Sequence, residues 1–187
     1  MPLPHFTNIP SHNNKWEPVF KNLFEVEIIL PELIGTRHPN ASELLMTNAT
    51  KTRLPVYPTL GNQTQRYKYS TRLFVGFPDS TSITDLGITF NINQDDNKQL
   101  FTFRIIKDWY DLVWNNEDGS SHYKKNVTGD IILYQHDREG EIIRRITYHN
   151  CQITGFQVGE ELVWGGGAEI QELSATWLVD WWEDYYF

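Results

Sequence analysis

Hydrophobic and polar residues alternate along several segments of this chain, which is the pattern of β-strands with one buried face. The longest alternation lies near the C-terminus, with apolar side chains at every second position: Leu173, Ala175, Trp177, Val179 and Trp181. It predicts a strand that places Trp177 and Trp181 in the core. A similar strand is predicted over residues 22–30, with Glu25 and Glu27 on the face opposite the apolar residues.

Other segments complete a β-rich pattern. Strand character returns in residues 44–54, 66–75 and 85–93. A hairpin is predicted from residues 129–136 and 141–154, which flank a turn at 137–140. If residues 136 and 141 pair, Leu133 would lie opposite Arg144 and apolar residues would fall on both faces of the hairpin. That arrangement predicts contacts on both sides, hence a role between subunits.

A single segment has a helical period. Apolar residues recur three or four positions apart from Leu100 to Val113, and Asp96 with Gln99 has the spacing of a capping box before them. Six or seven strands, one helix and no regular alternation of strands with helices predict a mainly β fold. We expect an antiparallel β-sandwich or barrel with one packed α-helix.

The N-terminal segment differs from the rest of the chain. Residues 1–20 hold four prolines and no periodicity, so we expect an N-terminal arm, either a loose tail or a strap onto a neighbouring subunit. Residues 21–187 are expected to form a single β domain. No apolar run suits a membrane span or a signal peptide, so we expect synthesis in the cytoplasm and no membrane partner.

Charge is distributed unevenly along the sequence. The net charge of −8 argues against attraction of the whole protein to nucleic acid. Residues 44–78 contain no acidic residue, whereas seven carboxylates and no Lys or Arg follow Arg145. Opposed patches of this kind could meet in a head-to-tail oligomer, although a solvated basic hairpin has the same composition.

No segment carries a convincing catalytic or metal-binding pattern. His149 and Cys151, two apart on one strand face, are at most half of a metal site. Glu160 and Glu161 are adjacent on the chain, so on a strand they would point to opposite faces and could not flank one glycosidic bond. Trp182 and the terminal Tyr-Tyr-Phe could stack on a sugar, but a place in the core or at a subunit interface is favoured. We therefore expect no enzymatic activity, no cofactor and no metal.

Short motifs between residues 22 and 183 resemble, in order and spacing, tail tube proteins of contractile-tailed bacteriophages, which share an Hcp-like fold. They are NLFEVEI at 22–28, TDL at 84–86 followed by ITF at 88–90, VGE at 158–160, EIQ at 169–171, AT at 175–176 and DWWE at 180–183. The resemblance implies a structural virion protein of a phage tail, made in the host cytoplasm. It implies a tail tube subunit that assembles into stacked hexameric rings.

The resemblance also implies partners and sites. The expected partners are further copies of the chain, the tail sheath, and baseplate or tail-terminator proteins, with DNA passing through the lumen without specific binding. Contacts between rings or subunits are expected at Lys51, Arg53, Arg66, Lys68 and Trp182. Acids that face the lumen and repel DNA phosphates are expected at Glu25, Glu27, Glu160, Glu161 and Glu169.

Three alternatives remain open at this point. A tube initiator or terminator, and the tube protein of a secretion system, would share the same fold. A carbohydrate-binding β-sandwich is a more distant alternative, which a stable monomer with glycan affinity would favour.

Overall fold

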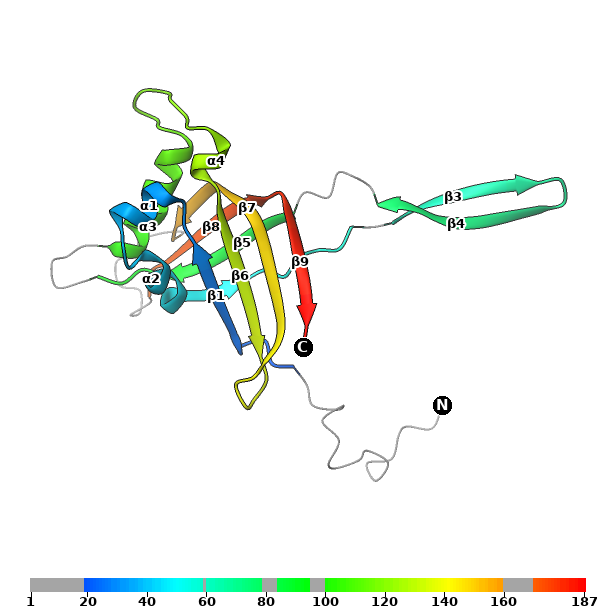
Figure 1. Ribbon diagram of the computed structural model, residues 1–187, viewed down its shortest axis with the longest axis horizontal. Coiled ribbons are helices and arrows are strands. Elements are labelled where there is room, and N and C mark those ends of the chain that lie inside the picture. The colour runs from blue at the N-terminus through cyan, green and yellow to red at the C-terminus, as the bar shows by residue number, and fades with distance from the viewer. Residues whose placement is uncertain (1–18, 59, 79–83, 95–99, 160–169) are drawn as a thin grey trace.

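The computed structural model describes residues 19–58, 60–78, 84–94, 100–159 and 170–187, whose main body is built on two antiparallel sheets (Figure 1). The first, sheet A, consists in this order of β1 (Phe24–Ile29), β6 (Gly129–His136), the first part of β7 (Ile142–Val158) and β9 (Trp181–Tyr186). The second, sheet B, consists in this order of the second part of β7, β8 (Glu172–Val179), β5 (Thr84–Asn91) and β2 (Ala49–Thr52). Because β7 belongs to both sheets, it joins them into one body.

The helices lie together at one side of this body, away from the projecting hairpin (Figure 1). They are α1 (Glu32–Arg37), α2 (Ala41–Asn48), α3 (Phe101–Val113) and α4 (Lys124–Val127). The longest, α3, buries Ile105, Ile106 and Trp109 in a hydrophobic core that both sheets share. The Trp109 indole N–H donates to the carbonyl of Val127 at 2.8 Å, which ties α3 to the end of α4.

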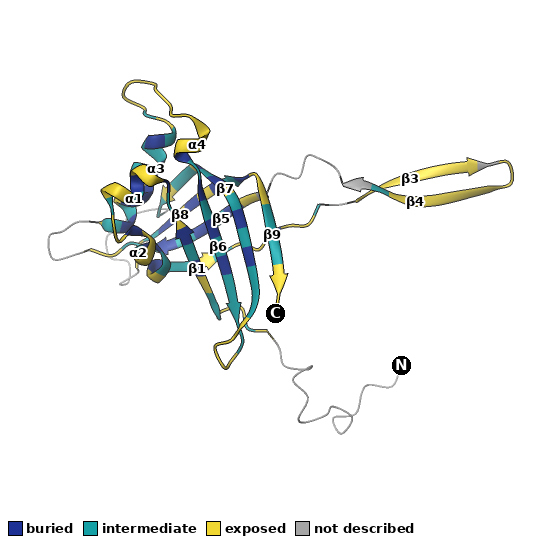
Figure 2. Ribbon diagram, viewed as in Figure 1, coloured by how far each residue is buried: buried dark blue, intermediate teal, exposed yellow. Residues whose placement is uncertain are grey.

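The remaining strands form a separate two-stranded sheet. Strands β3 (Leu60–Tyr67) and β4 (Ser70–Pro78) pair only with each other and project far from the body (Figure 1). Nearly all of their described residues are exposed, as Figure 2 shows. A lone hairpin of this kind is marginally stable in water unless something else covers it.

The mainly β architecture and the long packed helix agree with the prediction, but two of the predicted strands are wrong. Residues 44–54 begin in helix α2, because Ala41, Leu45 and Asn48 recur at helical spacing and are buried together. Only Ala49–Thr52 is a strand there. The predicted strand 66–75 instead crosses the turn between β3 and β4. The predicted capping box of α3 falls at residues 95–99, outside the described residues.

The predicted register of the β6–β7 hairpin is also wrong. Leu133 pairs with Ile146 rather than with Arg144, which pairs with Gln135. The register shifts near the turn, between Gln135 and His136, and the pairs from Ile131 to Gln135 are thereby moved by two residues from the predicted ones. In the observed pairing Leu133 and Ile146 are both buried on the core face. The contacts predicted on both sides of the hairpin therefore lose their basis.

The alternation near the C-terminus is correct up to Val179 and wrong at Trp181. Leu173, Ala175, Trp177 and Val179 are all buried, as predicted. Asp180 forms a bend between β8 and β9, so the side chain of Trp181 leaves the core and is 49% exposed. It stacks on the His149 ring, with 4.0 Å between ring centroids.

Candidate assembly surfaces

Sheet A has two free edges, which are strands β1 and β9. Each pairs on one side only, β1 with β6 and β9 with β7, among the residues that the structure describes. All neighbouring strands in this sheet are antiparallel, so β1 and β9 run in opposite directions. Unpaired edges of this length expose backbone N–H and C=O groups that can pair with another strand.

The outer face of sheet A is acidic and aromatic. Glu25 and Glu27 lie on this face of β1, opposite the buried Val26 and Ile28, as the alternation predicted. The strand pairing adds two acids that were not predicted to lie there, Asp130 and Glu183. Asp130 lies on this face of β6, beside Ile132, which pairs with Glu27, and Glu183 lies on the same face of β9. Asp130 alternates with the core residue Ile131, so a correct register would have found it, whereas Glu183 joins this face because the bend at Asp180 resets the alternation.

Contacts among these side chains keep the face ordered. The Tyr134 hydroxyl donates to Glu27 Oε2 at 3.0 Å, and burial together with this bond raises the pKa of Tyr134. His136 Nε2 lies 3.5 Å from Glu25 Oε2. Among the described residues of the four strands, Arg145 is the one arginine on this face, and it lies over the Tyr185 ring at 5.1 Å. Carboxylates therefore outnumber the guanidinium groups on this face.

Glu160, Glu161 and Glu169 lie outside the described residues, so their assignment to a lumen stays a prediction.

The four predicted contact cations divide into two separate groups. Lys51 and Arg53 belong to the strand β2 region on the body, where Lys51 Nζ is paired with Glu172 Oε2 at 2.8 Å. Arg66 and Lys68 lie near the turn of the projecting hairpin. Only the hairpin pair is therefore placed where it could reach beyond the body.

Strand β4 adds apolar surface to this basic hairpin. Leu73, Phe74 and Val75 are 76%, 45% and 70% exposed although they are consecutive apolar residues in a strand. An exposed apolar strand on a lone hairpin is characteristic of an interaction surface.

The fifth predicted contact residue, Trp182, lies at the base of the hairpin. It is partly buried against the core, and the Tyr57 ring packs edge-on against it at 4.8 Å. Because Trp182 is engaged in this way and Tyr185 lies on the opposite face of β9, the aromatic residues at the C-terminus do not form one flat platform for a sugar.

His149 and Cys151 do not share a strand face, contrary to the expectation from the alternation. His149 lies on the outer face of sheet A, whereas Cys151 is fully buried in the core. Asn150 between them has a positive φ of 54°, and this irregularity turns the two side chains to different faces. Burial raises the pKa of the Cys151 thiol to about 12. Within the described part of the chain, no three His, Cys, Asp or Glu side chains are grouped as metal ligands, and no helix is long and apolar enough to cross a membrane.

No protein-family model and no curated protein sequence matches this chain. Solved structures match it over nearly its whole length. A chain of the anti-feeding prophage tube-terminating cap is 11% identical, with a TM-score of 0.59 over 96% of this chain and 99% of that one. A chain of the sheath–tube complex of PVC, an extracellular contractile injection system, is 12% identical, with a TM-score of 0.56 over 92% of this chain and 95% of that one.

A third match extends the pattern. The terminator of the PVC sheath and tube is 12% identical, with a TM-score of 0.55 over 90% of this chain and 97% of that chain. At these identities the similarity is one of fold alone. The chain has the tube-protein fold of contractile injection systems, which confirms the fold class that the short motifs implied.

Proposed function

We propose that this protein is a structural subunit of the inner tube of a contractile tail, and that its copies close into rings that stack into a tube. Six copies per ring, the virion of a phage as its location, and sheath, baseplate and terminator proteins as partners all belong to this proposal. The observation that carries it is the pair of unpaired edges on sheet A, in a chain with the tube-protein fold.

The direction of the edge strands supports ring closure. Because β1 and β9 run in opposite directions, β9 of one copy can join β1 of the next as a further antiparallel pair. The arrangement repeats head to tail, so it closes when the rotation returns to the first copy. A closed barrel leaves no free edge in sheet A, which removes the hazard that these strands pose in a monomer.

The acidic face of sheet A supports a lumen that conducts DNA. In a closed barrel this face would be repeated in every copy, with Glu25 and Glu27 joined by Asp130 and Glu183. Carboxylates facing the channel repel phosphates, so DNA would pass without binding.

The basic hairpin supports contact between rings. Its cations Arg66 and Lys68 and its apolar strand β4 lie away from the body, where a neighbouring ring could cover them. Lys51, Arg53 and Trp182 lie on the body and are proposed to contact the adjoining copy. Lys51 would have to share its bond with Glu172.

Closure through the edges is tested with the variant Ile29→Lys. Ile29 ends the β1 edge and is 49% exposed, so a lysine there is compatible with folding but opposes strand addition. We expect wild-type protein to form rings or tubes in negative-stain electron microscopy at high concentration, and the variant to remain monomeric.

A matched control separates the edge from the added charge. Ile142→Lys makes the same change at a position that is 40% exposed at the start of β7, away from both free edges, and should assemble as the wild type does. Wild-type protein that stays monomeric at every concentration would refute the proposed function. Rings formed equally well by Ile29→Lys would refute the role of the β1 edge.

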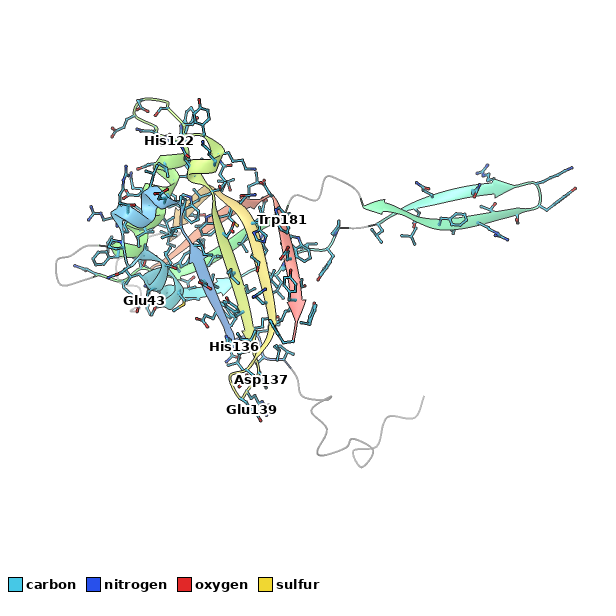
Figure 3. The ribbon with its side chains drawn as sticks, viewed as in Figure 1. Glu43, His122, His136, Asp137, Glu139 and Trp181 are labelled. Carbon is cyan, nitrogen blue, oxygen red and sulfur yellow. The ribbon has the colours of Figure 1, made fainter. Side chains whose placement is uncertain are left out.

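Lumen charge is tested with the double variant Glu25→Lys, Glu27→Lys. We expect assembled tubes of this variant to retain fluorescent single-stranded DNA at low salt and to release it as salt rises, because lysines bind phosphates by releasing counterions. Glu139→Lys with Glu141→Lys changes the net charge by the same amount at the β6–β7 turn (Figure 3), and these tubes should retain no DNA. Equal retention by both variants would contradict the assignment of the sheet A face to the lumen.

A tube terminator is the second candidate, since the cap of the anti-feeding prophage has the same fold with a TM-score of 0.59. A terminator should form single rings that do not stack, whereas a tube subunit should form polymers. The same micrographs distinguish them.

A further inference from the structure

Among the described residues next to the projecting hairpin, Tyr57 connects the segment that leads into it to the body. The hydroxyl of Tyr57 donates a hydrogen bond to Asp184 Oδ2 at 2.5 Å, and its ring packs edge-on against Trp182 at 4.8 Å. Both partners belong to strand β9, far from Tyr57 in the sequence. Tyr57 lies three residues before the start of β3, on the segment that leads into the hairpin.

The acceptor of this bond is held rigidly. Asp184 receives a two-point contact from Arg144, with Nε to Oδ1 at 2.9 Å and Nη2 to Oδ2 at 2.7 Å. The hydroxyl of Tyr186 reaches the same carboxylate at 3.2 Å, and the Asp184 side chain is only 7% exposed. The hydrogen bonds from Arg144 lower the pKa of Asp184, so the carboxylate stays charged at neutral pH.

The donor is kept in its neutral form by the same contact. Its hydrogen bond to Asp184 raises the pKa of Tyr57 to about 12. A folded pKa above the ordinary value of 10.0 means that the bond is intact at neutral pH and is lost as pH rises toward the raised value. A charge-assisted bond to a fixed carboxylate is among the stronger hydrogen bonds in proteins.

Other anchors of this segment lie further from the hairpin. Arg53 is held through its backbone, by its N–H to the Gly87 carbonyl at 3.1 Å and by the Tyr148 hydroxyl to its carbonyl at 3.4 Å. Between Arg53 and the hairpin, Val56 is 73% exposed. The hairpin itself pairs with no other described strand. Tyr57 is thus the described side chain closest to β3 that binds the body.

Strand β9 therefore makes one contact through its side chains and offers a second through its backbone edge. Its side chains Trp182 and Asp184 hold Tyr57, while its outer edge is the one proposed to pair with the next copy in the ring. The N–H of Phe187 donates to the Ile143 carbonyl at 3.2 Å, so by alternation the N–H groups of Trp182 and Asp184 point to that outer edge.

We propose that Tyr57 is a positioning residue, a latch by which β9 fixes the direction of the β3–β4 hairpin. When β9 pairs with the next copy in a ring, the hairpin is thereby held in the direction in which it can contact the next ring. This inference rests on the proposed function, since it assigns ring closure and ring stacking to two sides of one strand. Pairing of β9 with another strand reduces the motion of Asp184 and Trp182. Because Tyr57 binds both residues, the motion of the hairpin is reduced as well.

The test compares Tyr57→Phe with Tyr185→Phe. Tyr57→Phe keeps the ring on Trp182 and removes only the hydroxyl that reaches across to Asp184. Tyr185→Phe also removes a tyrosine hydroxyl that donates to a carboxylate, Glu183 Oε2 at 2.7 Å, but both residues lie on the opposite face of β9 from Asp184, so it leaves the latch in place. Spin labels at Tyr69→Cys and Glu139→Cys, both exposed, report the distance between the hairpin and the body. The native Cys151 is buried and does not compete for the label.

We expect Tyr57→Phe to broaden the distance distribution in the monomer and to lower the fraction of stacked rings by roughly threefold or more, because the hydrogen bond to Asp184 is exposed and competes with water. Single rings should still form. Tyr185→Phe should leave both the distribution and the stacking as in the wild type. In the wild type, the distribution should narrow from monomer to ring.

Two outcomes would overturn the inference. One is a Tyr57→Phe protein with the distance distribution and tube length of the wild type. The other is an equal loss in both variants, which would assign the effect to strand β9 as a whole and not to the contact of Tyr57 with Asp184. The distances in the monomer test the latch even if the wild type forms no rings, and that result would count against the proposed function alone.

Discussion

The variant Gly129→Ala is expected to lose about 3 kcal/mol or more of its free energy of unfolding, a loss at the severe end for a single methyl group. Gly129 is the first residue of β6 and is buried where β1, β6 and α3 meet. A Cβ atom there would lie 2.3 Å from the carbonyl oxygen of Ile29 and 3.3 Å from the Trp109 ring. The carbonyl is backbone of the paired edge strand, so β1 would have to move away from β6.

A second glycine provides the control. Gly155 in β7 has no heavy atom within 4 Å of the position of a Cβ, so Gly155→Ala should change the free energy of unfolding little. Chemical denaturation followed by tryptophan fluorescence gives both values. A Gly129→Ala protein within about 1 kcal/mol of the wild type would show that β1 shifts without loss of core packing.

Much of the core could be predicted from local periodicity. Alternation identified the buried residues of β8 and placed Glu25 and Glu27 opposite Val26 and Ile28, because a strand's two faces are fixed by a period of two. It failed at Trp181 because one bend residue, Asp180, resets that period. It also failed for residues 44–48, where a short buried helix and a strand have similar apolar content.

Contacts between residues that are far apart in the sequence could not be predicted from local periodicity. The Arg144–Asp184 pair and the bond from Tyr57 to Asp184 join residues 40 and 127 positions apart, and no local pattern links them. The hairpin register failed for a related reason, since a shift near the turn decides it. The basic composition of 44–78 was visible, but its division between β2 on the body and a projecting hairpin was not.

The largest loss among core substitutions is expected for Trp109→Ala, at about 3–5 kcal/mol. Trp109 is fully buried, and its ring lies 5.8 Å from that of Trp177 at the centre of the core. Truncation leaves a cavity between α3 and the sheets that the surrounding strands cannot fill. Denaturation in urea measures the loss, and Trp114→Ala, at a position that is 47% exposed, should cost little.

The two buried tryptophans should respond differently to phenylalanine, which separates packing from hydrogen bonding. Trp109→Phe loses ring volume and also leaves the Val127 carbonyl without its indole donor. Trp177→Phe loses the same volume but removes an indole N–H that has no partner among the described residues. Because an unpaired buried polar group costs about 1–3 kcal/mol, Trp177→Phe should be the milder change by about that amount. Equal losses would show that volume alone determines the stability of this core, and a milder Trp109→Phe would show that the bond to Val127 contributes nothing.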